Sequence, residues 1–364
     1  MSTTSSSLTT TSYARIGLIG NPSDGFHGKT ISFLIKNFEA SVSVFSSSSL
    51  VIEPHPDHDK TEYSSLEQLC NETNKKGYYG GIRLLKATCK VFFELCMKAA
   101  IDKSRILGKN FTMSYDTNIP RMVGLSGSSA LIVAAFKSLL KFYDITIKDL
   151  RIPKNQLPQI ILDIEKKELG INAGLQDRVI QVYGGLVHMD FSKEVFDVEG
   201  AGLYTKLDVS LLPNFYLVYC MNTGSDSGQI HSTVKERWSG RDPELVEGMK
   251  YLGTLADKTK QCLEEGRDLT TLCDLMDQNF ATRRKLYSDQ VVGEVNIRCV
   301  ELANSLGLAA KFTGSGGALI CLPRTKEKGW LDGDAEATAV EKFREAGFSM
   351  VRVEPAHDDD SLLA

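Results

Sequence analysis

The sequence predicts an α+β protein with two domains. Patterns typical of strands and of helices alternate from Ala14 to about Phe348, and many strands are spaced as hairpins, which favours α+β over a doubly wound sheet. The length of 364 residues is about twice that of an average domain. Because the chain changes character between Gly200 and Pro213, we expect an N-terminal domain over 13–207 and a C-terminal domain over 208–364.

The spacing of apolar residues assigns the individual elements. In the first domain we expect strands over 14–20, 111–120 and 183–191, a strand pair with a serine turn over 41–55, and helices over 80–100, 128–143 and 157–169. In the second domain we expect strands over 215–220 and 319–322, and helices over 227–238, 244–264, 269–286, 295–306 and 335–346.

Composition and charge exclude several classes of protein. The chain carries 42 Lys and Arg against 46 Asp and Glu, which argues against nucleic acid as a main partner. No apolar run reaches the roughly 18 residues that a membrane-spanning helix needs. The eight cysteines form no C-x-x-C pair, which indicates buried reduced thiols and a cytoplasmic protein. The polar first dozen residues lack the features of a signal or transit peptide, so a disordered tail is expected over 1–12. The oligomeric state is left open.

The segment from Pro120 to Ala130 is the most informative motif. It reads P-R-M-V-G-L-S-G-S-S-A and precedes an expected helix. Its glycines permit sharp backbone geometry, and its main-chain N–H groups, with the positive end of the helix dipole, suit a phosphate. A serine hydroxyl here can also bind Mg²⁺. A serine N-cap alone would need fewer small residues, so the loop is interpreted as phosphate-binding; it lacks the Gly-Lys-Ser/Thr ending of a Walker loop.

Two further segments could contribute to the same site. The cluster Gly314-Ser315-Gly316-Gly317 precedes an apolar strand, and three glycines in four positions indicate close backbone approach to another group. Glu165 ends an expected helix, and Asp177 follows a glycine-containing loop. One carboxylate for a divalent metal and one for a proton is what phosphoryl transfer requires, although each residue alone would fit a solvated helix face or a helix cap.

Taken in order, these motifs resemble the GHMP kinases, which include galactokinase, homoserine kinase, mevalonate kinase and phosphomevalonate kinase. The resemblance extends from Ala14 to Pro355. Within the family, the segments YGGIRLL, SYDTNIPRMVGLSGSSA, AGLQDRVIQVYGGLVHMDFSKE and SDSGQIHSTVKERW are most similar to plant-type glucuronokinases. The resemblance implies a ribosomal protein S5 domain 2-like N-terminal domain and a ferredoxin-like C-terminal domain.

The resemblance also implies roles for individual residues. Arg15 matches the basic residue that helps the attacking hydroxyl lose its proton, and Asp177 matches the catalytic base. Asp24 matches the sugar-binding aspartate, with Asp177 and its neighbour Arg178 also at the substrate. ATP would bind the loop made of Gly124, Leu125, Ser126, Gly127, Ser128, Ser129 and Ala130. Mg²⁺ would bind Glu165 and either Ser128 or Ser129.

This sequence departs from the family pattern at two points. Its phosphate loop has one residue more than the usual G-L-G-S-S-A, and Asn21-Pro22 stand where galactokinases have Glu-His. The implied activity is an ATP-dependent sugar-1-kinase acting on the anomeric hydroxyl of D-glucuronic acid and feeding UDP-glucuronate synthesis. Galacturonokinase, galactokinase and arabinokinase are alternatives, as is a sugar- and ATP-binding regulator without catalysis. A mevalonate-pathway enzyme is disfavoured by Asp24.

A uronic acid also requires a partner for its carboxylate. An arginine fork is the best geometric match for that group. The sequence offers five candidates: Arg121, Arg178, Lys29, Arg283 and Arg284.

Overall fold

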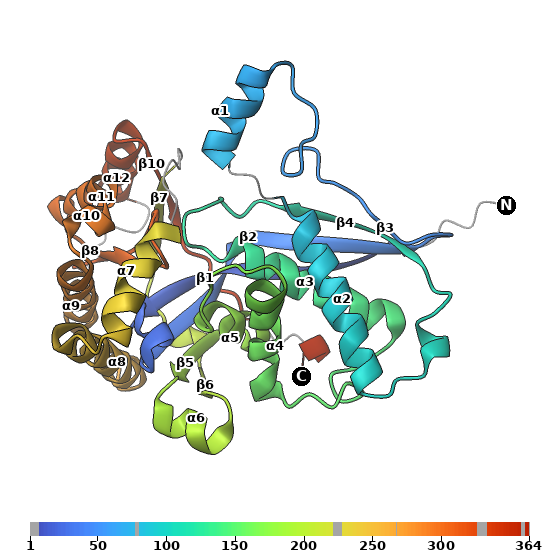
Figure 1. Ribbon diagram of the computed structural model, residues 1–364. Helices are drawn as coiled ribbons and strands as arrows, with labels where there is room; N and C mark the ends of the chain where they lie inside the picture. Colours follow the sequence, from blue (N-terminus) through green and yellow to red (C-terminus); the bar gives the residue numbers. More distant parts are fainter. Residues whose placement is uncertain are drawn as a thin grey trace.

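The computed structural model describes residues 7–76, 80–220, 228–266, 268–325, 333–357 and 361–363. The first half of the chain forms one β-sheet and the second half forms another, and each sheet is accompanied by helices (Figure 1). None of the helices in these ranges combines the length and the apolar character that crossing a membrane requires.

The first sheet contains six strands from the N-terminal half. They are β1 (Leu8–Ile19), β2 (Lys29–Ser46), β3 (Val51–Ile52), β4 (Phe111–Thr117), β5 (Leu186–Asp190) and β6 (Leu203–Leu207). Their order is β3-β4-β2-β5-β6, with β1 paired to β2. All pairs are antiparallel except β3 with β4.

The expected disordered tail over 1–12 is wrong for residues 8–12. They form the first part of β1, where Leu8 pairs with Val44 across the ladder. Thr10 is buried and its Oγ1 donates to the Ala134 carbonyl at 2.6 Å. Threonine is common in strands, and its hydroxyl can be buried when it is hydrogen-bonded. The polar composition of this segment is therefore compatible with an ordered strand. Residues 1–6 lie outside the described residues.

The expected strand pair over 41–55 also differs. β2 continues as one strand to Ser46, and the serine run leads to the short β3, which pairs in parallel with β4 and not with β2. The alternation of polar and apolar residues does not indicate which strand β3 pairs with, because its partner β4 lies about 60 residues later in the chain.

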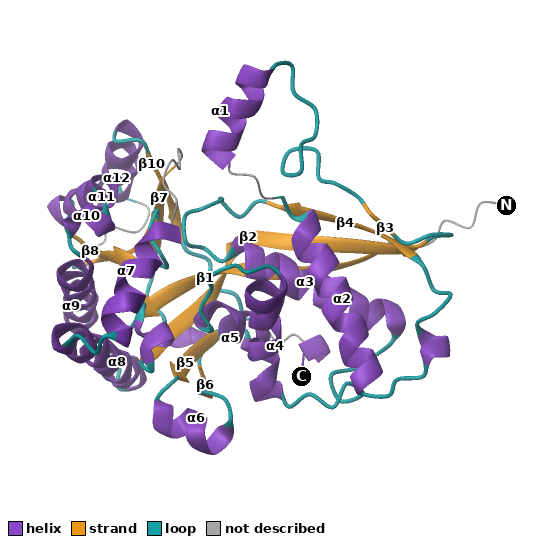
Figure 2. Cartoon of the chain, in the orientation of Figure 1, coloured by secondary structure: helices purple, strands orange, loops and turns teal. Residues whose placement is uncertain are grey.

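The first half also contains helices, most of which pack against its sheet or against one another, whereas the first of them stands apart from the sheet (Figure 1). They are α1 (Leu66–Lys76), α2 (Ile82–Lys98), α3 (Gly127–Tyr143), α4 (Leu157–Asp163) with a π-helical turn (Ile164–Glu168), α5 (Gln176–Tyr183) and α6 (Lys193–Glu199). Helix α3 packs on β1 and β2, and α2 packs on α3 (Figure 2). Nearly all side chains of α3 are buried, so its N-terminus is held rigidly at the edge of the core.

The second sheet has the order β10-β7-β9-β8 and is antiparallel throughout. Its strands are β7 (Tyr216–Cys220), β8 (Leu308–Phe312), β9 (Ala318–Pro323) and β10 (Phe348–Arg352). Numbered within the sheet the order is 4-1-3-2, with a helical crossover after the first and third strands, which is the ferredoxin-like arrangement. The first crossover contains α7 (Gly228–Ser239), α8 (Pro243–Glu264), α9 (Leu269–Tyr287), α10 (Asp289–Val292) and α11 (Glu294–Ser305); the second is α12 (Asp334–Glu345).

The two sheets separate between Leu207 and Tyr216, but the chain after β10 returns to the first sheet. The Ala356 N–H donates to the Leu34 carbonyl at 2.8 Å, and Ala356 is buried with β2 and α5. The last described segment, although we expect it in the second domain, therefore makes backbone hydrogen bonds with β2 of the first sheet.

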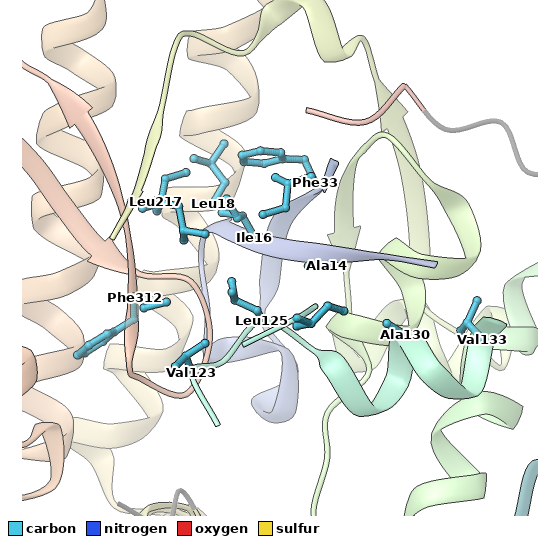
Figure 3. Packing of buried hydrophobic residues seen from close by; sticks show 14 of the residues in the cluster. Ala14, Ile16, Leu18, Phe33, Val123, Leu125, Ala130, Val133, Leu217 and Phe312 are labelled. Carbon is cyan, nitrogen blue, oxygen red and sulfur yellow. The ribbon is translucent and has the colours of Figure 1, made fainter. Parts of the chain in front are cut away.

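One apolar core connects the two halves. Phe33 of β2 stacks on Phe215, which precedes β7, with ring centroids 5.9 Å apart. Val123 and Leu125 of the phosphate loop lie between β1 and Phe312 of β8 (Figure 3). Burial of these side chains fixes the loop between the two halves of the molecule.

Candidate active site

Arg15 and Asp177 form the centre of the site. Arg15, in the middle of β1, is 5% exposed, and its Nε and Nη2 both lie 2.7 Å from Asp177 Oδ1. Asp177 stands in the first turn of α5, and its side chain keeps 21% exposure. Arg15 Nη1 also donates to the Gly124 carbonyl at 2.5 Å. One buried guanidinium thus connects the exposed carboxylate to the phosphate loop.

Asp24 belongs to the same group of charges. It lies in a short 3₁₀ turn (Ser23–Phe26) after β1, within electrostatic reach of both Asp177 and Arg15. Burial, together with the negative charge of Asp177, raises the pKa of the Asp24 carboxyl to about 6, against an opposing effect of Arg15. Gly174 allows this approach, since a Cβ there would be 2.6 Å from Asp24 Oδ2.

Glu165 lies in the π-helical turn, 1% exposed, and forms an ion pair with Arg178. Arg178 Nη1 also donates to the Gly174 carbonyl at 3.0 Å and lies 3.4 Å from Asp177 Oδ2. The Arg178 side chain is 3% exposed. Arg178 therefore supports Glu165 and Asp177, while its Nε is buried without a hydrogen-bond partner; its contact with the substrate stays a prediction.

The phosphate loop enters α3 through a left-handed residue. Ser126, the additional residue of the loop, is the N-cap with φ 64°, following Gly124 at φ 71°. Ser129 is fully buried and its Oγ donates to the Ser126 carbonyl at 3.2 Å, whereas Ser128 is exposed. Of the two serines considered for the metal, Ser128 has the accessible hydroxyl.

The C-terminal glycine loop contacts the phosphate loop directly. A Cβ at Gly124 would be 3.0 Å from the Gly316 carbonyl oxygen, and one at Gly314 would be 2.4 Å from the Gly124 carbonyl oxygen. A side chain at either position would separate the loops. The two glycine loops, which come from different halves of the chain, therefore meet; that they close on one ligand stays a prediction.

Two buried cations behind the loops were not predicted as supports. Arg283 of α9 donates to the Gly314 carbonyl at 2.6 Å and the Ser315 carbonyl at 2.8 Å. Lys311 of β8, 1% exposed, donates to Gly17 O and Asn21 Oδ1, each at 2.8 Å, and to Phe312 O. Burial and nearby arginines lower the pKa of Lys311, but three acceptors match the three donors of an ammonium.

The other candidates for the substrate carboxylate are engaged elsewhere. Lys29 pairs with Asp190 at 3.1 Å and Asp257 at 3.0 Å. Arg284 pairs with Asp289 at 2.5 Å on the surface of α9. Arg121 lies near His58 and Tyr115; burial lowers the pKa of His58 and raises that of Tyr115, and the charge of Arg121 is a smaller influence on both.

Helix α7 supplies residues that the sequence did not single out. Trp238 packs edge-on against Phe26 of the 3₁₀ turn, with centroids 5.1 Å apart, and Lys235 donates to Asn172 Oδ1 in the loop before α5. Both belong to the segment SDSGQIHSTVKERW, whose resemblance to plant-type glucuronokinases assigns no role to these two residues. Residues 221–227 lie outside the described residues, as do the surroundings of the His231 side chain.

The described residues can provide a base, an anion site and a hard-cation site. Asp177 is accessible and held by Arg15, and the α3 N-terminus presents unpaired N–H groups. Glu165 Oε1 is buried without a hydrogen-bond partner, so a ligand position remains on this carboxylate. No group of three or more His, Cys, Asp or Glu side chains in the described residues could hold a metal ion alone. A Mg²⁺ ion shared with phosphates needs only one or two protein ligands, and Glu165 with Ser128 fits that requirement.

Comparisons with known proteins agree with this geometry. Residues 84–185 match the family described as GHMP kinases N terminal domain. Glucuronokinase 1 of Arabidopsis thaliana is 47% identical over 354 residues, covering 96% of this chain and 93% of the relative. Probable glucuronokinase 2 of the same plant is 50% identical over 310 residues, covering 85% of this chain and 82% of the relative.

Solved structures show the same fold at low identity. The crystal structure of Lactococcus lactis galactokinase complexed with galactose aligns with a TM-score of 0.67 and 16% identity, covering 96% of this chain and 93% of that chain. At this identity the likeness concerns the fold alone.

Proposed function

The chain belongs to the GHMP kinase family, and on that premise we propose that it is a glucuronokinase, which transfers the γ-phosphoryl group of ATP to the anomeric hydroxyl of D-glucuronic acid. The products would be glucuronate 1-phosphate and ADP. The observation that carries the proposal is the contact of Arg15 with both Asp177 and the Gly124 carbonyl. It couples a carboxylate able to accept a proton to the loop that would hold the phosphates.

The reaction assigns separate tasks to these residues. Asp24 would bind a ring hydroxyl and so orient the sugar, while the N–H groups at the start of α3 would hold the ATP phosphates. The anomeric hydroxyl gives its proton to Asp177 Oδ2, since Oδ1 accepts from Arg15 at 2.7 Å whereas Oδ2 has only the longer 3.4 Å contact with Arg178. The sugar oxygen forms the new bond to the γ-phosphorus, and the bond to the ADP oxygen breaks.

Mg²⁺ bound by Glu165 and Ser128 would neutralise phosphate charge during transfer. Arg178 holds Glu165 from the opposite side through an ion pair. Asp177 and Glu165 thus share one buried support, which fixes the two carboxylates relative to each other.

We place the protein in the cytoplasm. Five of its cysteines are buried, and burial raises the pKa of the Cys96 and Cys273 thiols to about 11. Such thiols are unreactive, and their use in a core is typical of reducing compartments.

An ADP-release assay with a sugar panel tests the proposal. The purified protein, Mg²⁺ and ATP are combined with glucuronate, galacturonate, galactose, glucose or arabinose, and Asp177→Asn is the matched inactive variant. We expect the highest kcat/KM with glucuronate. A higher value with another sugar would make that sugar the substrate, and binding of sugar and ATP without turnover would favour the regulator.

A further inference from the structure

We propose that Lys235 on α7 binds the carboxylate of the substrate and so sets the preference for a uronic acid over a neutral sugar. The inference rests on the proposed function and names a residue for its specificity. It concerns one side chain from the second half of the chain, which contacts the loop before α5 in the first half.

The buried cations of the site already have partners within the protein. Within the described part of the chain, Arg15 and Arg178 are buried in ion pairs with Asp177 and Glu165, and Arg283 lies within electrostatic reach of Asp24. Arg283 and Lys311 donate to main-chain and amide oxygens behind the glycine loops. Each of these buried cations thus already has a partner inside the protein, and a substrate carboxylate would pair best with a cation that has no carboxylate partner.

Lys235 has the charge to fill this role. Its Nζ donates to the neutral amide of Asn172, and within the described part of the chain it forms no ion pair. Burial and the neighbouring charge of Lys166 lower the pKa of Lys235. A bound carboxylate would relieve this unfavourable environment, because an opposite charge stabilises an ammonium.

The contacts of α7 place Lys235 at the sugar. Asn172 is two residues before Gly174, whose backbone is in contact with the Asp24 carboxylate, so on the order of 7 Å of chain separates the two positions. Trp238, on the same side of the helix three residues later, packs on Phe26, two residues after Asp24. Two independent contacts thus hold α7 (yellow in Figure 1) over the segments before and after the sugar-binding aspartate.

Calorimetric titration of glucuronate, with ADP present, tests the inference directly. Lys235→Gln should raise the Kd on the order of 10–100-fold, the range of a hydrogen bond to a charged group. Lys235→Arg should retain most of the affinity. Lys250→Gln, which removes an exposed lysine from α8, should leave the Kd unchanged.

A second variant separates charge recognition from a structural role. Asn172→Asp keeps the lysine but gives it a permanent carboxylate partner, so glucuronate should again bind more weakly while the neutral glucuronamide is unaffected. A Kd for Lys235→Gln within threefold of wild type, or equal losses for glucuronate and glucuronamide, would overturn the inference. If the wild-type protein neither binds nor phosphorylates glucuronate, the proposed function itself has failed.

Discussion

The pH dependence of stability should reveal the environment of Asp24. The carboxyl has an ordinary pKa of 3.8, and burial with the charge of Asp177 raises it to about 6 in the folded protein. Between these pH values the folded state holds a proton that the unfolded state has released. The stability from this proton is fully present below about pH 3.8 and is lost as the pH rises through about 6. The whole change amounts to about 3 kcal/mol.

Replacing the aspartate by asparagine removes this titration. Urea unfolding of the ligand-free wild type and Asp24→Asn at pH 5 and pH 8 gives the difference in free energy of unfolding at each pH. The range from pH 5 to pH 8 contains only the upper part of this titration. The free energy of unfolding of Asp24→Asn minus that of the wild type should therefore be about 1.4 kcal/mol higher at pH 8 than at pH 5.

The neighbouring aspartate provides an internal control. In an Asp177→Asn background the negative charge that helps to raise the pKa of Asp24 is gone, so the movement between pH 5 and pH 8 should be smaller. A difference that stays constant between the two pH values would refute the reasoning, since it would mean that Asp24 titrates alike in both states.

Three further variants test other parts of the site. Asp177→Asn should lower kcat by at least ~100-fold while sugar and ATP still bind, as expected for loss of a general base; more than about a tenth of wild-type turnover would contradict the assignment. Glu165→Gln should raise the Mg²⁺ concentration needed for half-maximal rate and lower Tm, because an amide is a weaker metal ligand and balances no buried cation; an unchanged Mg²⁺ titration would remove the metal role. Gly314→Ala should raise the KM for ATP and destabilise the fold by about 1–3 kcal/mol, since its Cβ would overlap the phosphate loop; Gly240→Ala, with only ordinary contacts at 3.5 Å, should change neither.

The sequence predicted the parts of the site that are encoded locally. The phosphate loop and the start of α3 follow from glycines, serines and an apolar period within twenty residues. The spacing of Glu165 and Asp177 likewise describes a helix end and the next helix start. Each of these features depends on neighbouring residues, so a linear pattern contains the necessary information.

Long-range contacts could not be predicted in this way. Lys235 becomes a candidate for substrate binding only because α7 contacts a loop some 60 residues earlier in the chain. Arg178 directly follows Asp177 in the sequence, but no local pattern indicates that its guanidinium pairs with Glu165. The ordered start of β1 and the return of Ala356 to β2 likewise depend on pairing partners that no local pattern specifies.

Regiochemistry tests the central claim most directly. Phosphorus–proton correlation NMR of the reaction of the wild-type protein with ATP, Mg²⁺ and glucuronate identifies the carbon that carries the new phosphate. The account predicts a phosphorus signal coupled to the anomeric proton and loss of the reducing end, in amounts equal to the ADP released. A phosphate on any other carbon, or ADP formed without a phosphorylated uronic acid, would contradict it.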